Sequence, residues 1–149
     1  MFGSTGAFRN TSLLVLMFLL LTAETIDVRA QAYERDLKTS AKSLLTIKNR
    51  TGRVSVIASD NEKDKASLKA SSTGGTVEAS DITVSGNDIT VHERPYRIDL
   101  TVRVPKRARV KIETEAGMVD VIGDFEVAEV ITNTGTIHAD VPTEALKLK

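Results

Sequence analysis

The chain of 149 residues contains two histidines and no cysteine, so the side chains available for nucleophilic or metal chemistry are few. His92 and His138 form no His-x-x-x-His or His-x-x-Glu-His spacing, and a metal site needs three or four converging ligands. The absence of thiols excludes disulfides, thiolate metal sites and cysteine nucleophiles. We therefore expect no metal site and no cofactor, with both histidines facing solvent.

Asp120 is the carboxylate best placed to act as an acid or a base. It lies in a segment that recurs along the chain, and enzymes that cut polysaccharides can use carboxylates stacked in successive coils. If the copies stack in register, the neighbours of Asp120 are Ser55 and His138 rather than a second carboxylate. Asp124 and Asp140 do not occupy the same position of the repeat as Asp120. The sequence therefore predicts no catalytic residue, and a small polysaccharide-acting solenoid enzyme is the disfavoured alternative.

A dense cluster of cations follows one of the expected strands. Such a cluster could form a positive edge for an anionic glycan, and its members are Arg103, Lys106, Arg107, Arg109 and Lys111. The competing explanation is that lysine and arginine protect an exposed strand edge against aggregation. We favour edge protection and keep the anionic-glycan-binding module as the alternative function.

Two shorter motifs have simpler explanations. The segment Gly86 to Asp88 lacks the alternating ligand series of a calcium loop, and its glycine and asparagine suit a tight hairpin turn. Asn49 begins an Asn-Arg-Thr glycosylation sequon, but its place at a turn explains it without a sugar. Twenty basic and twenty acidic residues cancel, and aromatic residues make up only 4% of the chain. This composition disfavours nucleic-acid binding.

The N-terminal segment, residues 1–32, has the pattern of a secretory signal peptide. Arg9 precedes an uninterrupted apolar run from Leu13 to Leu21, which is too short to span a bilayer. Small residues at the end of the segment predict cleavage after Ala30 or Ala32. We expect a secreted protein of the periplasm, cell envelope or extracellular space, with no transmembrane span after cleavage.

The rest of the chain divides into a charged linker, residues 33–43, and a β domain, residues 44–149. From Leu44 onward apolar and polar residues alternate, which is typical of half-buried strands. Strands are predicted at 82–84, 89–91, 98–104 and 109–114, and Pro105 ends the third of them. Residues 61–76 are expected to be a long exposed loop around at most one weak strand.

An internal repeat is the most informative feature of this domain. Residues 45–56 align without gaps to residues 110–121, and a third copy at 128–139 follows at a spacing of 18 residues. Each copy combines a short strand, a polar turn with a glycine and a second strand; the glycines are Gly52, Gly117 and Gly135. So short a unit cannot bury its own apolar face, so we expect the copies to stack as an all-β, solenoid-like or sandwich-like array. Unrelated hairpins that merely look alike are the alternative.

These residues resemble the bacterial "putative adhesin" family of repetitive envelope β domains. The resemblance covers about residues 44–142 and rests on a strand ending in Val104-Pro105 and on two Gly-x-Val-x-Val-like turns, at Gly117 and Gly135. Two positions depart from the family pattern: Lys106-Arg107 stands where the family often has glycine, and Ala139 replaces a larger apolar residue. The resemblance implies an exported module with a repetitive β architecture.

The preferred function from the sequence is a non-enzymatic exported module for surface adhesion or structural spacing. A surface polysaccharide or another envelope protein is the expected partner. Leu146 to Lys149 match the start of a fourth copy at the same 18-residue step, so we expect the β domain to be incomplete at its C-terminal end. The family resemblance implies that further repeats or a downstream domain, such as a von Willebrand factor A-type module, can follow.

Overall fold

The computed structural model describes residues 32–149, and nearly all of the predicted signal peptide lies outside them. The described chain is all-β apart from two short 3-10 turns, η1 (Ala79–Asp81) and η2 (Thr143–Ala145). None of its helical segments is long and apolar enough to cross a bilayer. The strands are β1 (Tyr33–Lys38), β2 (Leu44–Lys48), β3 (Val54–Ser59), β4 (Lys65–Ser71), β5 (Ile82–Ser85), β6 (Asp88–Val91), β7 (Asp99–Pro105), β8 (Ala108–Ile122), β9 (Phe125–Asp140) and β10 (Leu146–Leu148).

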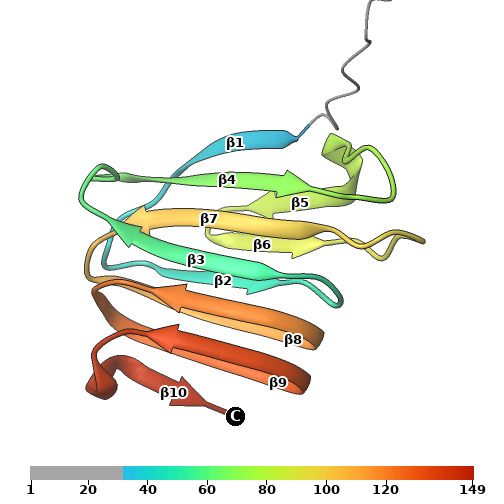
Figure 1. Cartoon of the computed structure of the whole chain (residues 1–149). Helices are drawn as coiled ribbons and strands as arrows, with labels where there is room; N and C mark the ends of the chain where they lie inside the picture. The colour runs from blue at the N-terminus through green and yellow to red at the C-terminus, as the bar shows by residue number, and fades with distance from the viewer. Residues whose placement is uncertain (1–31) are drawn as a thin grey trace, which may run out of the picture.

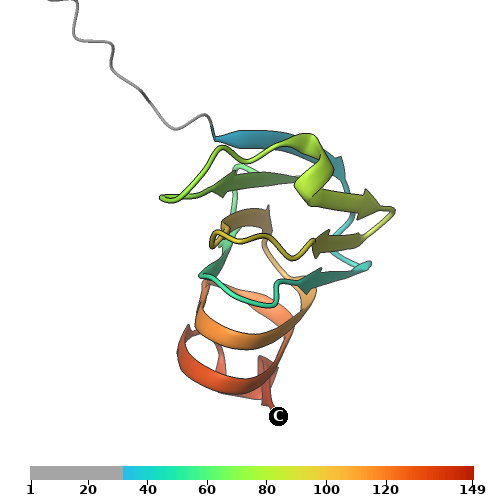
Figure 2. The same ribbon diagram turned by 90° about the vertical axis from the view of Figure 1, so that its right-hand side faces the viewer.

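The strands form a single sheet that curls over on itself into two facing walls (Figures 1 and 2). Strands β1, β4, β7 and β3 make the first wall, and β5, β6 and β2 make the second. The long strands β8 and β9 bend and belong to both: the N-terminal half of β8 pairs with β2, and its C-terminal half pairs with β3. β10 pairs with the N-terminal half of β9 and so extends the second wall.

Parallel pairing aligns the copies of the repeat position by position. Leu45 pairs with Val110, and Val110 pairs with Ala128. Across the bend, Val56 pairs with Val121, which pairs with Ala139. The gapless alignment of the first two copies and the 18-residue step to the third are therefore the actual register of the sheet. The copies carry apolar residues at the same positions, so this pairing keeps every apolar side chain on the inner face of the sheet.

The core lies between the two walls and consists of ladders of aliphatic side chains. Ile47, Ile112 and Val130 form one ladder and are each fully buried. Phe125 is also buried, at the start of β9. With few aromatic residues, the stack depends on branched aliphatic side chains, which suit the pleated surface of a strand.

The bend between the walls is built on glycine. Gly52, Gly117 and Gly135 lie one above another, and a Cβ on Gly117 would overlap the carbonyl oxygen of Gly52. A Cβ on Gly135 would likewise overlap the carbonyl oxygen of Gly117. We call these three residues the glycine column. Residues with side chains would force the neighbouring backbone segments apart at this bend.

Two stretches differ from the prediction. Residues 33–43, expected as a linker, contain β1, which pairs along its whole length with β4 and buries Leu37. Residues 61–76, expected as a long exposed loop around at most one weak strand, contain the seven-residue strand β4 inside the first wall, with Ala66, Leu68 and Ala70 buried. Charged residues on the outer side of β1 and small apolar residues in β4 weaken the alternation that reveals the other strands.

Candidate functional site

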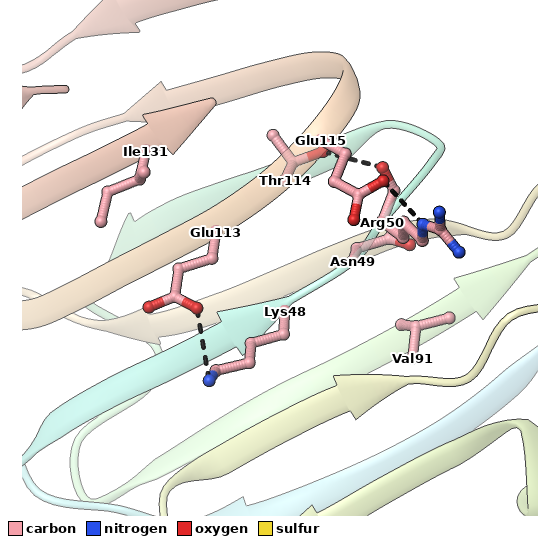
Figure 3. A pocket seen from close by; sticks show the side chains of 8 residues that line it. All are labelled: Lys48, Asn49, Arg50, Val91, Glu113, Thr114, Glu115 and Ile131. Carbon is pink, nitrogen blue, oxygen red and sulfur yellow. Dashed lines mark hydrogen bonds and ion pairs between the residues drawn. The ribbon is translucent and has the colours of Figure 1, made fainter. Parts of the chain in front are cut away.

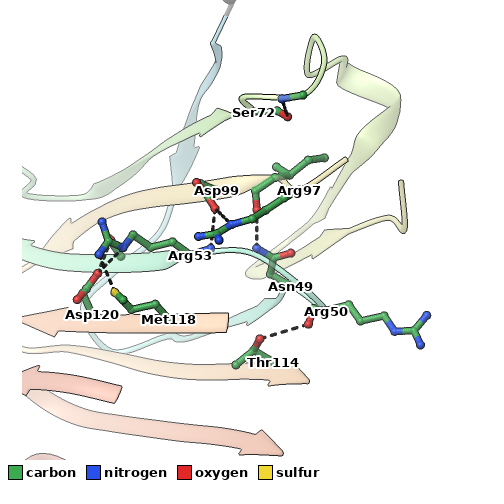
Figure 4. A network of polar contacts seen from close by, with 12 residues as sticks. Asn49, Arg50, Arg53, Ser72, Arg97, Asp99, Thr114, Met118 and Asp120 are labelled. Carbon is green, nitrogen blue, oxygen red and sulfur yellow. Dashed lines mark hydrogen bonds and ion pairs between the residues drawn. The ribbon is translucent and has the colours of Figure 1, made fainter. Parts of the chain in front are cut away.

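The outer face of the first wall carries a polar ladder built from the three aligned copies. Ser55, Asp120 and His138 pair across β3, β8 and β9, as the repeat alignment predicted for Asp120. The Ser55 hydroxyl donates to Asp120 Oδ2 over 3.1 Å, and Arg53 Nε lies 3.2 Å from the same oxygen (Figure 4). His138 Nδ1 lies 3.9 Å from Asp120 Oδ1.

This ladder contains the three residue types of a serine hydrolase, but in the wrong order. In a catalytic triad the histidine stands between serine and aspartate, so that it takes the proton of the serine hydroxyl. Here Asp120 stands between Ser55 and His138, and the hydroxyl of Ser55 donates to the carboxylate. The arrangement links neighbouring strands through hydrogen bonds, and the hydroxyl of Ser55 contacts a carboxylate rather than the imidazole of a triad.

The outer face of the second wall is hollowed by a groove with a volume of about 420 Å³ (Figure 3). Charged side chains of opposite sign line it in pairs. Lys48 Nζ lies 3.3 Å from Glu113 Oε2, and Lys111 Nζ, beside the groove, lies 2.7 Å from Glu113 Oε1. The hydrogen bond from Lys111 is the largest influence on Glu113; together with Lys48 it lowers the pKa of this carboxyl group, against the effect of partial burial.

Arg50 forms the end of the groove at the bend. Its guanidinium contacts Glu115 of β8 over 2.6 Å and Glu93 of the β6–β7 loop over 2.5 Å. Behind it, the buried amide of Asn49 donates to the carbonyl oxygen of Ile98. Sequence reasoning missed the groove, although the aligned copies place Lys48 opposite Glu113, which is the signal that could have indicated it.

The most buried charge in the described chain is Asp81, which sequence reasoning also missed. Its carboxylate contacts Arg94 Nε over 2.5 Å, the Tyr96 hydroxyl over 3.0 Å and the backbone N–H of Glu78 over 2.9 Å. Burial acts to raise the pKa of Asp81, but these hydrogen bonds outweigh it and hold the pKa below its usual value. The β5–β6 hairpin lies between Glu78 on one side and Arg94 and Tyr96 on the other. Asp81 therefore connects the segment before the hairpin to the segment after it.

The five cations of the predicted positive edge do not share one surface. Arg103 projects from the outer face of the first wall, whereas Arg109 and Lys111 project from the second wall. Lys106 and Arg107 lie in the turn between β7 and β8. Lys106 Nζ contacts Asp60 over 2.7 Å, and Lys111 contacts Glu113. The structure therefore divides the cluster and pairs two of its members with acids.

Neither histidine has the surroundings of a metal ligand. His92 contacts the Thr83 hydroxyl across the β5–β6 hairpin over 2.7 Å. Within residues 32–149, no three His, Asp or Glu side chains converge closely enough to hold a metal ion.

Comparisons with known proteins give one distant likeness of fold. No protein-family model matches the chain, and no curated protein matches its sequence. Among solved structures, the chain is similar to a crystal structure described as a "putative cell adhesion protein" from Clostridium sporogenes, with a TM-score of 0.50 and 12% sequence identity. The match covers 70% of this chain and 59% of that one, so this chain spans less than two thirds of its neighbour's length. At this identity, the likeness concerns the fold alone.

Proposed function

We propose that the chain is a non-enzymatic, exported β module of the cell envelope or extracellular space, with a role in surface adhesion or as a structural spacer. Its repeated coils form a solenoid-like stack. The module acts through an extended, stiff surface rather than through a reaction centre.

One observation carries this proposal: the polar side chains that could do chemistry are used to join successive coils. Asp120 connects Arg53 and Ser55 of the coil above it, and Glu113 is held by Lys48 and Lys111. Cross-strand pairs of this kind stabilise a sheet. A catalytic carboxylate, by contrast, must lie within hydrogen-bond reach of the substrate proton that it transfers.

Two further features support the assignment. The apolar run at residues 13–21 has the pattern of an export signal. The fold is similar to that of a protein described as a "putative cell adhesion protein", and a likeness of fold supports function only by analogy.

The test compares host cells that carry the gene with cells from which it is deleted. Attachment to surfaces and cell-to-cell aggregation should fall on deletion and should be restored by the wild-type gene. An Asp120→Asn variant, which keeps the shape of the ladder, should restore attachment equally well because no reaction depends on the carboxylate. Depolymerisation of a uronic-acid polymer by the wild-type protein, lost in Asp120→Asn, would overturn the proposal.

A further inference from the structure

A second hollow lies beside the groove of the second wall, on the other side of Arg50. Its volume is about 150 Å³, and it shares Asn49, Arg50 and Val91 with the groove. The two hollows therefore form one continuous surface that passes from β8 over Arg50 to the β6–β7 loop. We call this surface the Arg50 groove; residues 48–51, 91–94 and 113–115 supply most of its lining.

The charges of the Arg50 groove are accessible and already paired. The side chains of Arg50, Glu93 and Glu115 are each at least half exposed, and the guanidinium contacts both carboxylates (Figure 3). Lys48, also more than half exposed, contacts Glu113. The surface thus presents hydrogen-bond donors and acceptors side by side, and each charge is balanced by a neighbour.

Paired charges favour a neutral ligand that is rich in hydroxyl groups. A hydroxyl donates to a carboxylate and accepts from a guanidinium or an ammonium group, so it binds both members of an ion pair without separating them. An anionic ligand would instead compete with Glu93 and Glu115 for Arg50 and would leave a carboxylate without its cation. A cationic ligand would separate the same pairs by taking the carboxylates.

Apolar and aromatic residues at the same surface suit the carbon face of a sugar ring. Val91 lines both hollows, and Tyr96 lines the second one. Tyr96 is held firmly: its hydroxyl contacts Asp81 over 3.0 Å, and its ring packs so closely on Gly75 that a Cβ there would lie 2.9 Å from two ring atoms. A rigid aromatic side chain binds a ligand with little loss of conformational entropy.

We propose that the Arg50 groove binds a neutral hexose unit of a surface glycan. The sugar hydroxyl groups bridge Arg50 and Glu115, and the carbon face of the ring lies toward Val91 and Tyr96. The larger hollow alone, at about 420 Å³, is within the size range of sites that hold a small organic ligand. The inference rests on the proposed role in adhesion and adds the place and the chemical class of the ligand.

A polypeptide is the rival ligand, because its N–H and C=O groups also donate and accept hydrogen bonds. An extended peptide gains most of its affinity by adding a strand to the edge of a sheet. The Arg50 groove lies on the outer face of the second wall, where side chains and not backbone groups meet the ligand. The position of the groove therefore favours the glycan.

The first test measures binding of the full chain to neutral oligosaccharides of glucose, galactose, mannose and N-acetylglucosamine by calorimetric titration. At least one should bind, and Arg50→Met and Glu115→Ala should each weaken it by about tenfold. Glu93→Ala, which changes a side chain that is 73% exposed, should weaken it in the same direction with an unchanged melting temperature. Glu34→Ala is the matched control: this carboxylate is paired with Lys69 on the first wall, and its loss should leave binding unchanged.

The second test separates a neutral ligand from an anionic one. Affinity for the neutral oligosaccharide should change by less than about twofold from about 0.1 M to about 1 M sodium chloride, because no net charge is neutralised on binding. A uronic-acid oligosaccharide of the same length should bind more weakly. Changes in backbone amide shifts on titration should be largest in residues 48–51, 91–96 and 113–115.

Four results would overturn the inference: no neutral oligosaccharide binds, none of the three groove variants weakens binding, the uronic-acid oligosaccharide binds more tightly and loses affinity in salt, or only an unstructured polypeptide binds. The proposed function fails separately. Gene-dependent attachment without glycan binding would contradict the inference alone, and glycan binding by a protein whose deletion leaves attachment unchanged would contradict the proposed function alone.

Discussion

The carboxylate of Asp81 accepts three hydrogen bonds at a buried site, and its ionisation is therefore coupled to folding. Its pKa in the folded chain lies below the unfolded value of about 3.9. A depressed pKa contributes stability that is complete above the unfolded value and is lost as the pH falls through the folded one.

We expect Asp81→Asn to lower the free energy of unfolding by about 2 kcal/mol at neutral pH, because an amide cannot accept all of these bonds. The difference in free energy of unfolding between the two proteins should narrow below about pH 4. In wild type, protons bind Asp81 first in the unfolded chain and, at lower pH, in the folded chain, so its extra stability is lost. Urea unfolding measured across this pH range checks both statements. Asp88→Asn is the control, since Asp88 is exposed at the start of β6. An equal loss in both variants would contradict the role assigned to Asp81.

Arg107 has a backbone conformation that glycine adopts more readily. Its φ is 63°, in the left-handed region, and it lies in the turn between β7 and β8. Its backbone N–H donates to the carbonyl oxygen of Asp124, so the turn is held in place. The turn therefore carries an arginine in a conformation that suits glycine better.

We expect Arg107→Gly to retain or raise the melting temperature, and Arg107→Val to destabilise by about 1–2 kcal/mol, because a branched Cβ is strained at positive φ. Thermal unfolding of the two variants checks this order. A higher melting temperature for the valine variant would contradict the turn geometry.

Among the elements, those with full alternation were predictable from the sequence. The predicted segments 82–84, 89–91 and 98–104 correspond to β5, β6 and β7, and the repeat alignment supplied the register of β2, β3, β8 and β9. β1 was missed because Leu37 is its one buried side chain, and β4 was expected at most as a weak strand because two of its buried residues are alanines. The Asp81 cluster depends on contacts between segments 13 and 15 residues apart, which no local pattern indicates.

The glycine column is the element on which the bend depends. We expect Gly117→Ala to destabilise by about 3 kcal/mol, because the added methyl group would overlap a backbone carbonyl that cannot move without separating two coils. Gly86→Ala is the matched control: Gly86 has a positive φ but open space around it, so its cost should be about 1 kcal/mol. Chemical denaturation measures both. Equal losses would mean that backbone conformation, and not contact between coils, accounts for the effect.

At the scale of the whole molecule, local stability should decrease from the middle of the sheet toward β9 and β10. Each strand is held mainly by its neighbours, and within the described residues only the short strand β10 pairs with β9 on the side away from β8. Hydrogen exchange of the purified protein should be fastest in β10 and in the C-terminal half of β9, and slowest in β3 and the central part of β8. Uniform protection would indicate that the stack opens only as a unit.

The proposed export of the chain depends on its N-terminal segment, nearly all of which lies outside the described residues. Leu16→Arg combined with Leu19→Arg should keep the protein in the cytoplasm with its N-terminal segment attached, because two charges interrupt the apolar run. Mass spectrometry of the exported wild type should show a new N-terminus at Gln31 or Tyr33. An exported product that retains Leu13 to Leu21 would indicate a membrane anchor.

The glycine column also constrains how such a gene can change in length. Gly135 lies against the carbonyl oxygen of Gly117 because 18 residues separate them. A single residue inserted between them would place another residue against that carbonyl oxygen. It would also exchange the inward and outward faces of the rest of the strand. The β3–β4 turn lies outside this count, so insertions there should be tolerated better. Viable length variants of the last coils should therefore differ by whole multiples of the 18-residue step, as a tandem duplication produces.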